Sequence, residues 1–163
     1  MKAFRVVVAV SVVAVVLASA GVAFAKPLSE TQWKKRGNAI CKQINTDIDT
    51  IGNEVFAGLG PNEQPTDEQV TSFVEQVLPV VEDGVASINK LEEPKSLKKG
   101  IKKFNCEVRK LIVKLDTDPT VLLSTPDPFQ TVNKAAKAVG LKECANGSGL
   151  ATQPAEFEGH WGR

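Results

Sequence analysis

Apolar residues recur at intervals of three and four over most of this chain, and this spacing constrains its fold more than any other feature. From about residue 30 to residue 139 the apolar side chains follow the helical period, and no segment shows the strict alternation that is typical of a half-buried strand. We therefore predict an all-α protein: an up-down antiparallel four-helix bundle followed by a flexible C-terminal tail.

Two capping boxes mark the starts of the first two expected helices, over residues 30–57 and 66–91. Ser29 pairs with Gln32, and Thr66 pairs with Gln69. In each pair the hydroxyl and the side-chain amide satisfy free backbone N–H groups at the start of a helix. Gly58 supplies the left-handed turn that ends the first helix. The apolar stripe of the first helix consists of Trp33, Ile40, Ile44, Ile48, Ile51 and Val55.

Short connections lead into the third and fourth expected helices. Glu92-Glu93-Pro94 precedes the third helix, over about residues 95–116, which should pack antiparallel to the second. A short turn follows at Asp118-Pro119, and Asp127-Pro128 starts the fourth helix, which stops at Gly140-Leu141. No periodicity follows, so we expect a bundle domain over residues 26–145 and a flexible tail over residues 146–163.

The first 25 residues have the three parts of a secretory signal peptide. Lys2 and Arg5 precede an uncharged apolar run, and Ala23-Phe24-Ala25 provides the small residues of a cleavage site. The alternative is an uncleaved anchor, because about 20 apolar residues can also span a bilayer. Both interpretations place the rest of the chain outside the cytoplasm. We predict a secreted or cell-envelope protein, cleaved near Ala25.

Charge and aromatic content argue against some classes of partner. Loss of Lys2 and Arg5 with the leader changes the formal net charge from +1 to −1, so the overall charge does not favour nucleic acid. Cations do cover the outer face of the third helix, which can give weak contact with anionic envelope components. The alternative is a face that is only solvated. These cations are Lys95, Lys98, Lys99, Lys102, Lys103, Arg109, Lys110 and Lys114.

Three short motifs carry a family resemblance. They are Trp33 followed by Gly37-Asn38-Ala39-Ile40-Cys41, then Leu91-Glu92-Glu93-Pro94, and finally Ala138-Val139-Gly140-Leu141-Lys142-Glu143-Cys144. Together they resemble a family of small exported helical proteins and lipoproteins of actinobacteria and their relatives, largely without assigned function. The resemblance covers about residues 33–144 and implies one cysteine on the first helix and one after the last. It supplies no catalytic residues, and both Cys106 and the missing lipidation cysteine depart from the pattern.

The three cysteines, in an oxidising compartment, suggest one disulfide and one remaining thiol. The resemblance implies a bridge between Cys41 and Cys144. Helix geometry agrees, because Cys41 lies about 16 Å along the first helix and about 50° from the centre of its stripe, where it can face the end of the fourth helix. The alternatives are a bridge between Cys106 and Cys144, or three free thiols.

Cys106 lies about 180° from the centre of the apolar face of the third helix. Lys102, Lys103, Arg109 and Lys110 surround it within about one turn. Nearby cations stabilise a thiolate and make an exposed cysteine more nucleophilic. These five residues are therefore a candidate reactive-thiol site, suited to a mixed disulfide, a covalent dimer or redox chemistry. The alternative is that Cys106 has no role.

No catalytic or cofactor-binding constellation stands out in this sequence. The single histidine, His160, lies in the expected tail, which leaves no His-based triad or zinc site to assemble. Asp116-Thr117-Asp118 lacks the glycine and the bidentate glutamate of a calcium loop. We therefore expect no metal, no cofactor and no enzymatic activity.

These observations favour an exported, non-enzymatic helical-bundle protein, a binding or interaction module whose ligand the sequence does not identify. One alternative is a thiol-dependent extracytoplasmic factor that uses Cys106. A further alternative is an enzyme whose site is not legible in the sequence. Labelling of exposed thiols should separate the first two functions. The interior of the bundle should test the third, because a core that is packed solid leaves no pocket for a substrate.

Overall fold

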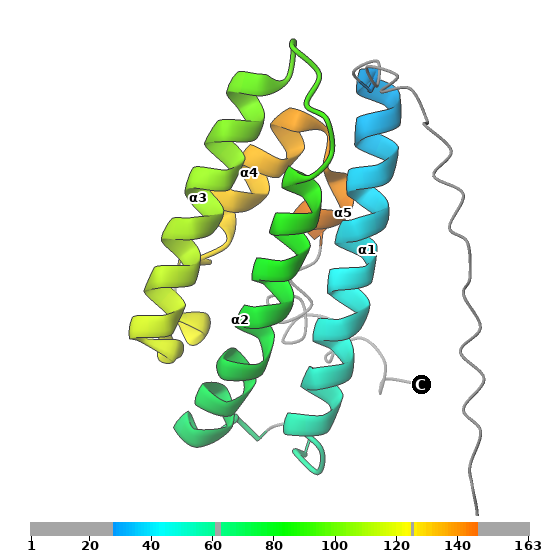
Figure 1. Cartoon of the computed structure of the whole chain (residues 1–163). Coiled ribbons are helices and arrows are strands. Elements are labelled where there is room, and N and C mark those ends of the chain that lie inside the picture. The colour runs from blue at the N-terminus through cyan, green and yellow to red at the C-terminus, as the bar shows by residue number, and fades with distance from the viewer. Residues whose placement is uncertain (1–27, 61–62, 125, 147–163) are drawn as a thin grey trace, which may run out of the picture.

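The computed structural model describes residues 28–60, 63–124 and 126–146, and all regular secondary structure in these ranges is helical (Figure 1). This confirms the all-α class. The elements are α1 (Glu30–Val55), α2 (Asp67–Asn89), α3 (Lys98–Thr117), the 3-10 helix η1 (Pro119–Leu123), α4 (Gln130–Val139) and α5 (Lys142–Asn146). The predicted signal peptide and, apart from Asn146, the predicted tail lie outside the described residues. No helix in the described part of the chain is both long enough and apolar enough to span a membrane.

Both predicted capping boxes are present. The backbone N–H of Gln32 donates to Ser29 Oγ over 3.2 Å, and the backbone N–H of Ser29 donates to Gln32 Oε1 over 3.2 Å. Thr66 and Gln69 exchange the same two bonds at the start of α2. Since each box satisfies two backbone donors that would otherwise be free, both helices begin where the sequence predicts.

The predicted stop after α4 is a complete Schellman motif. Gly140 adopts a left-handed φ of +81°, its N–H donates to Lys137 O over 3.1 Å, and Leu141 N–H donates to Ala136 O over 3.0 Å. A left-handed residue at this position is least costly when it is glycine. The turn reverses the chain, so that α5 follows α4 directly.

The predicted start of the third helix was a few residues early. α3 begins at Lys98 rather than Lys95, because a separate turn precedes it. In that turn Leu97 N–H donates to Pro94 O over 2.9 Å. Pro94 is therefore the first residue of a turn that ends the connection from α2, and α3 begins after this turn.

The limits of α1 and α4 also differ from the prediction. Asp127 Oδ1 accepts from the backbone N–H of Phe129 over 2.8 Å, which forms a turn ahead of α4, and regular helix starts only at Gln130. α1 ends at Val55, and Gly58 takes its left-handed conformation in the turn that follows the helix. Asp127 and Gly58 therefore each belong to a turn next to the helix, and neither is the residue at which the helix begins or ends.

Three long helices lie side by side in alternating directions, and α4 with α5 fills the fourth position only along part of their length (Figure 1). α1 contacts α2 and α5, α3 contacts α2 and α4, and η1 contacts α2 and α3. We call the end at which α1 begins the upper half of the bundle and the end at which α1 ends the lower half. α4 and α5 lie in the upper half, and η1 lies in the lower half.

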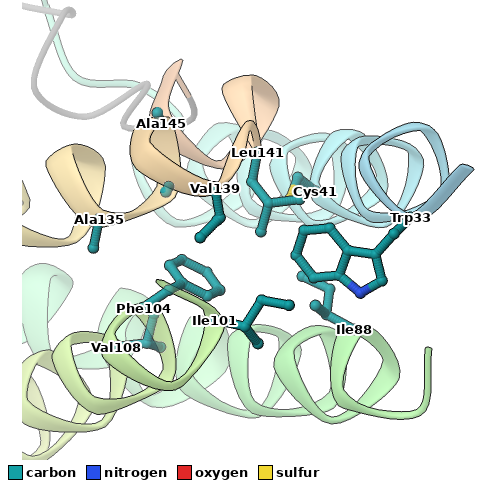
Figure 2. Packing of buried hydrophobic residues seen from close by; sticks show 11 residues of the cluster. Trp33, Cys41, Ile88, Ile101, Phe104, Val108, Ala135, Val139, Leu141 and Ala145 are labelled. Atoms are coloured by element: carbon teal, nitrogen blue, oxygen red, sulfur yellow. The ribbon is translucent and has the colours of Figure 1, made fainter. Parts of the chain in front are cut away.

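Each half has its own cluster of buried side chains. The upper core, shown in Figure 2, brings together α1, α2, α3, α4 and α5 around fully buried Trp33 and Leu141. Close contact there depends on two glycines: a Cβ at Gly37 would collide with the side chain of Leu141, and a Cβ at Gly100 would collide with that of Val139. The lower core consists of Phe73, Val74, Val77 and Leu115.

The predicted stripe of α1 is fully buried only at its upper end. Trp33 is 0% exposed, whereas Ile40, Ile44, Ile48 and the later stripe residues are only half-buried. Cys41, which lies beside the stripe, is also 0% exposed. The cause is the arrangement of neighbours, since α5 covers the middle of α1 and the lower part of that helix packs mainly against α2. Among the described residues, the apolar side chains of lower α1 thus lack full cover.

Candidate functional site

A disulfide joins α1 to the end of the described chain. Cys41 and Cys144 are bonded, their Cα atoms lie 4.9 Å apart, and 103 positions separate them in the sequence. This is the pairing that the family resemblance implied. It fixes α5 against the middle of α1, at the boundary between the upper and lower halves.

Hydrogen bonds from α1 reinforce the same junction. Asn38 Nδ2 donates to Gly140 O over 2.9 Å and to Lys34 O over 2.8 Å, while Asn38 Oδ1 accepts from Glu143 N–H over 2.9 Å. About two turns further down α1, Asn45 Nδ2 donates to Glu143 O over 3.0 Å. We call this junction the disulfide corner; it consists of Gly37, Asn38, Cys41, Asn45, Gly140, Leu141, Glu143 and Cys144.

The disulfide corner explains two of the three resemblance motifs in physical terms. The first motif contributes Gly37, Asn38 and Cys41, and the third contributes the Gly140 carbonyl and Cys144. The corner needs a small residue at Gly37, a carboxamide at Asn38 and thiols at Cys41 and Cys144. These motifs therefore hold the fold together, and the ligand site has to be sought elsewhere.

An apolar pocket of about 120 Å³ lies directly below the corner, where the upper and lower cores meet. For scale, an engineered apolar cavity of about 150 Å³ in another protein stays dry and binds benzene or xenon. Side chains from α1, α2, α3, α4, η1 and α5 line it: Cys41, Ile44, Asn45, Ile48, Val74, Val77, Leu78, Val81, Val85, Phe104, Val108, Leu111, Ile112, Leu115, Leu122, Phe129, Val132, Asn133 and Cys144.

The sequence analysis did not predict this pocket, although Ile44 and Ile48 of its lining belong to the predicted stripe of the first helix. The missed signal is the length of the fourth helix. α4 has 10 residues, whereas α1, α2 and α3 have 26, 23 and 20. A fourth helix that spans only part of the bundle leaves the remaining apolar faces incompletely covered, and a pocket forms where it begins.

The residues that line the pocket extend along the helices. They run from Cys41 to Ile48 on α1, about 10 Å at ~1.5 Å per residue, and over about 16 Å on each of α2 and α3. The volume of about 120 Å³ is small for a lining of this length. Its upper end is closed by the disulfide and by Phe104, which is buried.

Only two amide side chains interrupt the apolar lining among the described residues. They are Asn45 on α1 and Asn133 on α4, both half-buried, and no charged side chain takes part. Asn45 lies on α1, which packs mainly against α2 and α5, and Asn133 lies on α4, which packs mainly against α3 and α5. The chemistry that the pocket offers is therefore apolar contact along its lining with neutral hydrogen bonding at the two asparagines.

The candidate thiol site lies on a different surface, the outer face of α3. Cys106 is free and exposed, and it shares a shallow depression with Lys102, Arg109 and Lys110. Lys110 Nζ also contacts Glu107 Oε1 over 3.0 Å, and this hydrogen bond, followed by the charge of Glu107, raises the pKa of Lys110 above its ordinary value. Lys103 is exposed on the same helix but does not line the depression.

An apolar side chain extends this basic face. Val113 lies two turns beyond Cys106, lines the same depression and is 65% exposed. Elsewhere in the described residues no group of three or more His, Cys, Asp and Glu side chains is placed to hold a metal ion. His160, the single histidine, lies outside the described residues.

Comparisons with protein-family models, with curated proteins and with solved structures found no match to this chain.

Proposed function

We propose that this chain is an exported, non-enzymatic binding module, an up-down four-helix bundle whose interior takes a small apolar ligand. The observation that carries the proposal is the pocket of about 120 Å³ between the two cores. Pockets lined by apolar side chains with a few polar groups are the usual form of small-molecule sites, and they are common between the helices of bundles. Its neutral lining favours binding over acid–base chemistry, which needs a titratable group within reach of the substrate.

Export rests on two independent features. The leader has the charge, apolar run and small residues of a signal peptide. The disulfide between Cys41 and Cys144 is of the kind that persists in oxidising compartments and is rare in the cytosol. The corner motifs support placing the chain in the family of small exported helical proteins of actinobacteria.

Mass spectrometry of the protein from its native host tests the export proposal. We expect an N-terminus at Lys26 in the secreted or envelope fraction, because Ala23-Phe24-Ala25 supplies the cleavage site. A main species in the membrane fraction that retains Met1 would instead identify the leader as an anchor.

Thermal unfolding in the presence of benzene tests the binding proposal. With the disulfide intact, benzene at about 100 times its Kd should raise the Tm by about 5–10 °C, since a ligand that binds only the folded state stabilises it by mass action. Val81→Phe should abolish the rise, because Val81 lines the pocket and the larger side chain fills it. Val113→Phe is the matched control, since Val113 is exposed on the outer face of α3. No rise in the parent protein, or an equal rise in Val81→Phe, would overturn the proposal.

A second candidate function is a thiol-dependent extracytoplasmic factor. The observation in its favour is that Cys106 is free and exposed while the other two cysteines are bridged. Lys102, Arg109 and Lys110 lie around it, as the predicted reactive-thiol site requires. The same cations give this face its possible weak contact with anionic envelope components.

Maleimide labelling under native conditions tests this second function. Cys106 should be labelled rapidly, and added salt should slow the reaction because exposed charges are screened over about 8–10 Å at ordinary ionic strength. Replacing Lys102, Lys103, Arg109 and Lys110 together by Gln should slow it further. Non-reducing gels should show a covalent dimer that Cys106→Ser removes. A thiol that reacts no faster than free cysteine, with no salt dependence, would leave Cys106 without this role.

A further inference from the structure

We infer that the pocket takes the unbranched alkyl chain of a single-chain amphiphile and holds its small neutral polar head at Asn45 and Asn133. This inference rests on the proposed function and specifies the ligand class. Three properties of the pocket carry it: its shape, the polarity at one side and the position of its opening.

The shape favours a chain over a ring. The lining extends for about 10 Å on α1 and about 16 Å on α2 and α3, yet the volume is only about 120 Å³. A compact ligand, such as a fused-ring compound, needs a cavity that is wide in all directions. An extended hydrocarbon chain fills a long, narrow space with contacts along its whole length, and each methylene buried is worth about 0.8 kcal/mol.

The two asparagines favour a head group that is polar but uncharged. Asn45 uses its Nδ2 on the Glu143 carbonyl, which leaves Asn45 Oδ1 as an acceptor beside the pocket. The carboxamide of Asn133 makes no hydrogen bond to another described residue. Together they offer both donor and acceptor atoms, which suits a hydroxyl. A charged head would need a counter-charge, and no charged side chain lines the pocket in the described part of the chain.

The opening agrees with this orientation. The upper end of the pocket is closed by the Cys41–Cys144 bridge and by buried Phe104. Asn45 and Asn133, by contrast, keep partial exposure and lie on α1 and α4. A chain that enters here places its alkyl part among the valines and leucines of α2 and α3 and leaves its head beside the two amides.

Calorimetric titration of the disulfide-bonded protein with alcohols of equal carbon number tests the shape. We expect 1-octanol to bind at least tenfold more tightly than cyclooctanol. In a series of primary alcohols from 1-butanol upward, affinity should rise about fourfold per added carbon and then level off once the chain fills the pocket. Both measurements use the unaltered sequence, so they do not depend on whether a variant folds.

Asn133→Leu tests the head group. It should weaken 1-octanol binding by about two- to tenfold, the change expected for one hydrogen bond, and leave n-hexane binding unchanged or stronger. Asn53→Leu is the matched control, because Asn53 is exposed on α1 and does not line the pocket. Circular dichroism and a count of free thiols establish that each variant retains the fold and the bridge.

The outcomes separate this inference from the proposed function. If benzene and cyclooctanol bind and 1-octanol binds no better, the pocket is a ligand site but the chain-shaped ligand is wrong. If Asn133→Leu weakens 1-octanol and n-hexane equally, or neither, the placement of the head group is wrong. If neither benzene nor any alcohol binds, the proposed function fails together with the inference.

Discussion

The two halves of this bundle are built differently, although the same three long helices run through both. In the upper half a disulfide, two hydrogen bonds from the Asn38 carboxamide to Gly140 and Glu143, and close glycine contacts fix α4 and α5 between α1 and α3. In the lower half, within the part of the chain that the structure describes, η1 holds the fourth position and the apolar residues of α1 stay half-buried. Because the disulfide holds the upper half together, the bundle can keep its fold while an apolar pocket remains below the bridge.

This comparison predicts that stability is concentrated in the upper half, and the disulfide tests it with the largest expected effect. Replacing both Cys41 and Cys144 by Ser should lower the free energy of unfolding by about 4–5 kcal/mol, the chain-entropy value for a loop of about 100 residues. Urea titration at neutral pH measures the change. A loss below about 1 kcal/mol would mean that the corner is held by its other contacts alone.

A matched pair of leucines compares the two cores directly. Leu141→Ala should cost about 2–5 kcal/mol, because Leu141 is fully buried in the upper core against Gly37. Leu122→Ala should cost less than about 1.5 kcal/mol, since Leu122 is half-buried at the pocket and loses fewer contacts. Denaturant unfolding of both variants checks the difference. Equal costs would show that the lower half is packed as firmly as the upper.

Much of the helical framework could be predicted from the sequence, because its determinants are local. The capping boxes at Ser29 and Thr66 and the stop at Gly140 each depend on a few neighbouring residues, and all three lie where expected. The bridge between Cys41 and Cys144 followed from the resemblance together with the heights of two helices. The short turn expected at Asp118-Pro119 is the 3-10 helix η1.

The pocket could not be predicted in the same way, because it depends on how far α4 extends along the apolar faces of the other helices. The stripe of α1 continues evenly from Ile44 to Val55, and nothing in that periodicity reveals that a neighbour ends halfway. Likewise Asn38 and Asn133 are both asparagines on the inner side of helices, yet one clamps the corner and the other lines the pocket. Only the tertiary position of α4 distinguishes them.

Two asparagines on α1 give a finer comparison. Asn38→Ala removes three hydrogen bonds at the corner and should cost about 2 kcal/mol, whereas Asn45→Ala removes one and should cost about 1 kcal/mol. Hydrogen exchange supplies the local measurement. The Glu143 amide should exchange much faster in Asn38→Ala, because it loses its acceptor, and little faster in Asn45→Ala. Unchanged exchange in Asn38→Ala would show that the bridge alone orders α5.

The smallest expected effect concerns the top of the upper half and depends on pH. Glu30, in the first turn of α1, accepts from the hydroxyl of Ser96 and from Lys34 Nζ. The Ser96 hydrogen bond, followed by the hydrogen bond and charge of Lys34, lowers the pKa of Glu30 below its ordinary value of 4.5. A carboxyl group whose pKa is lowered by folding stabilises the folded state above the unfolded pKa, and this contribution is lost as pH falls through the folded pKa.

Glu30→Gln should therefore be slightly less stable than the parent protein at pH 7, and the difference should disappear as the pH falls below 4.5. Urea unfolding of both proteins at pH 7, 4.5 and 3 measures it. Glu75→Gln is the matched control, because Glu75 is exposed on α2 and makes no hydrogen bond to another described residue. The effect is small because Glu30 and Lys34 remain partly exposed, and solvent screens the pair. A difference that grows on acidification, or one that Glu75→Gln reproduces, would show that the contact between Glu30 and Ser96 does not help to close the upper half.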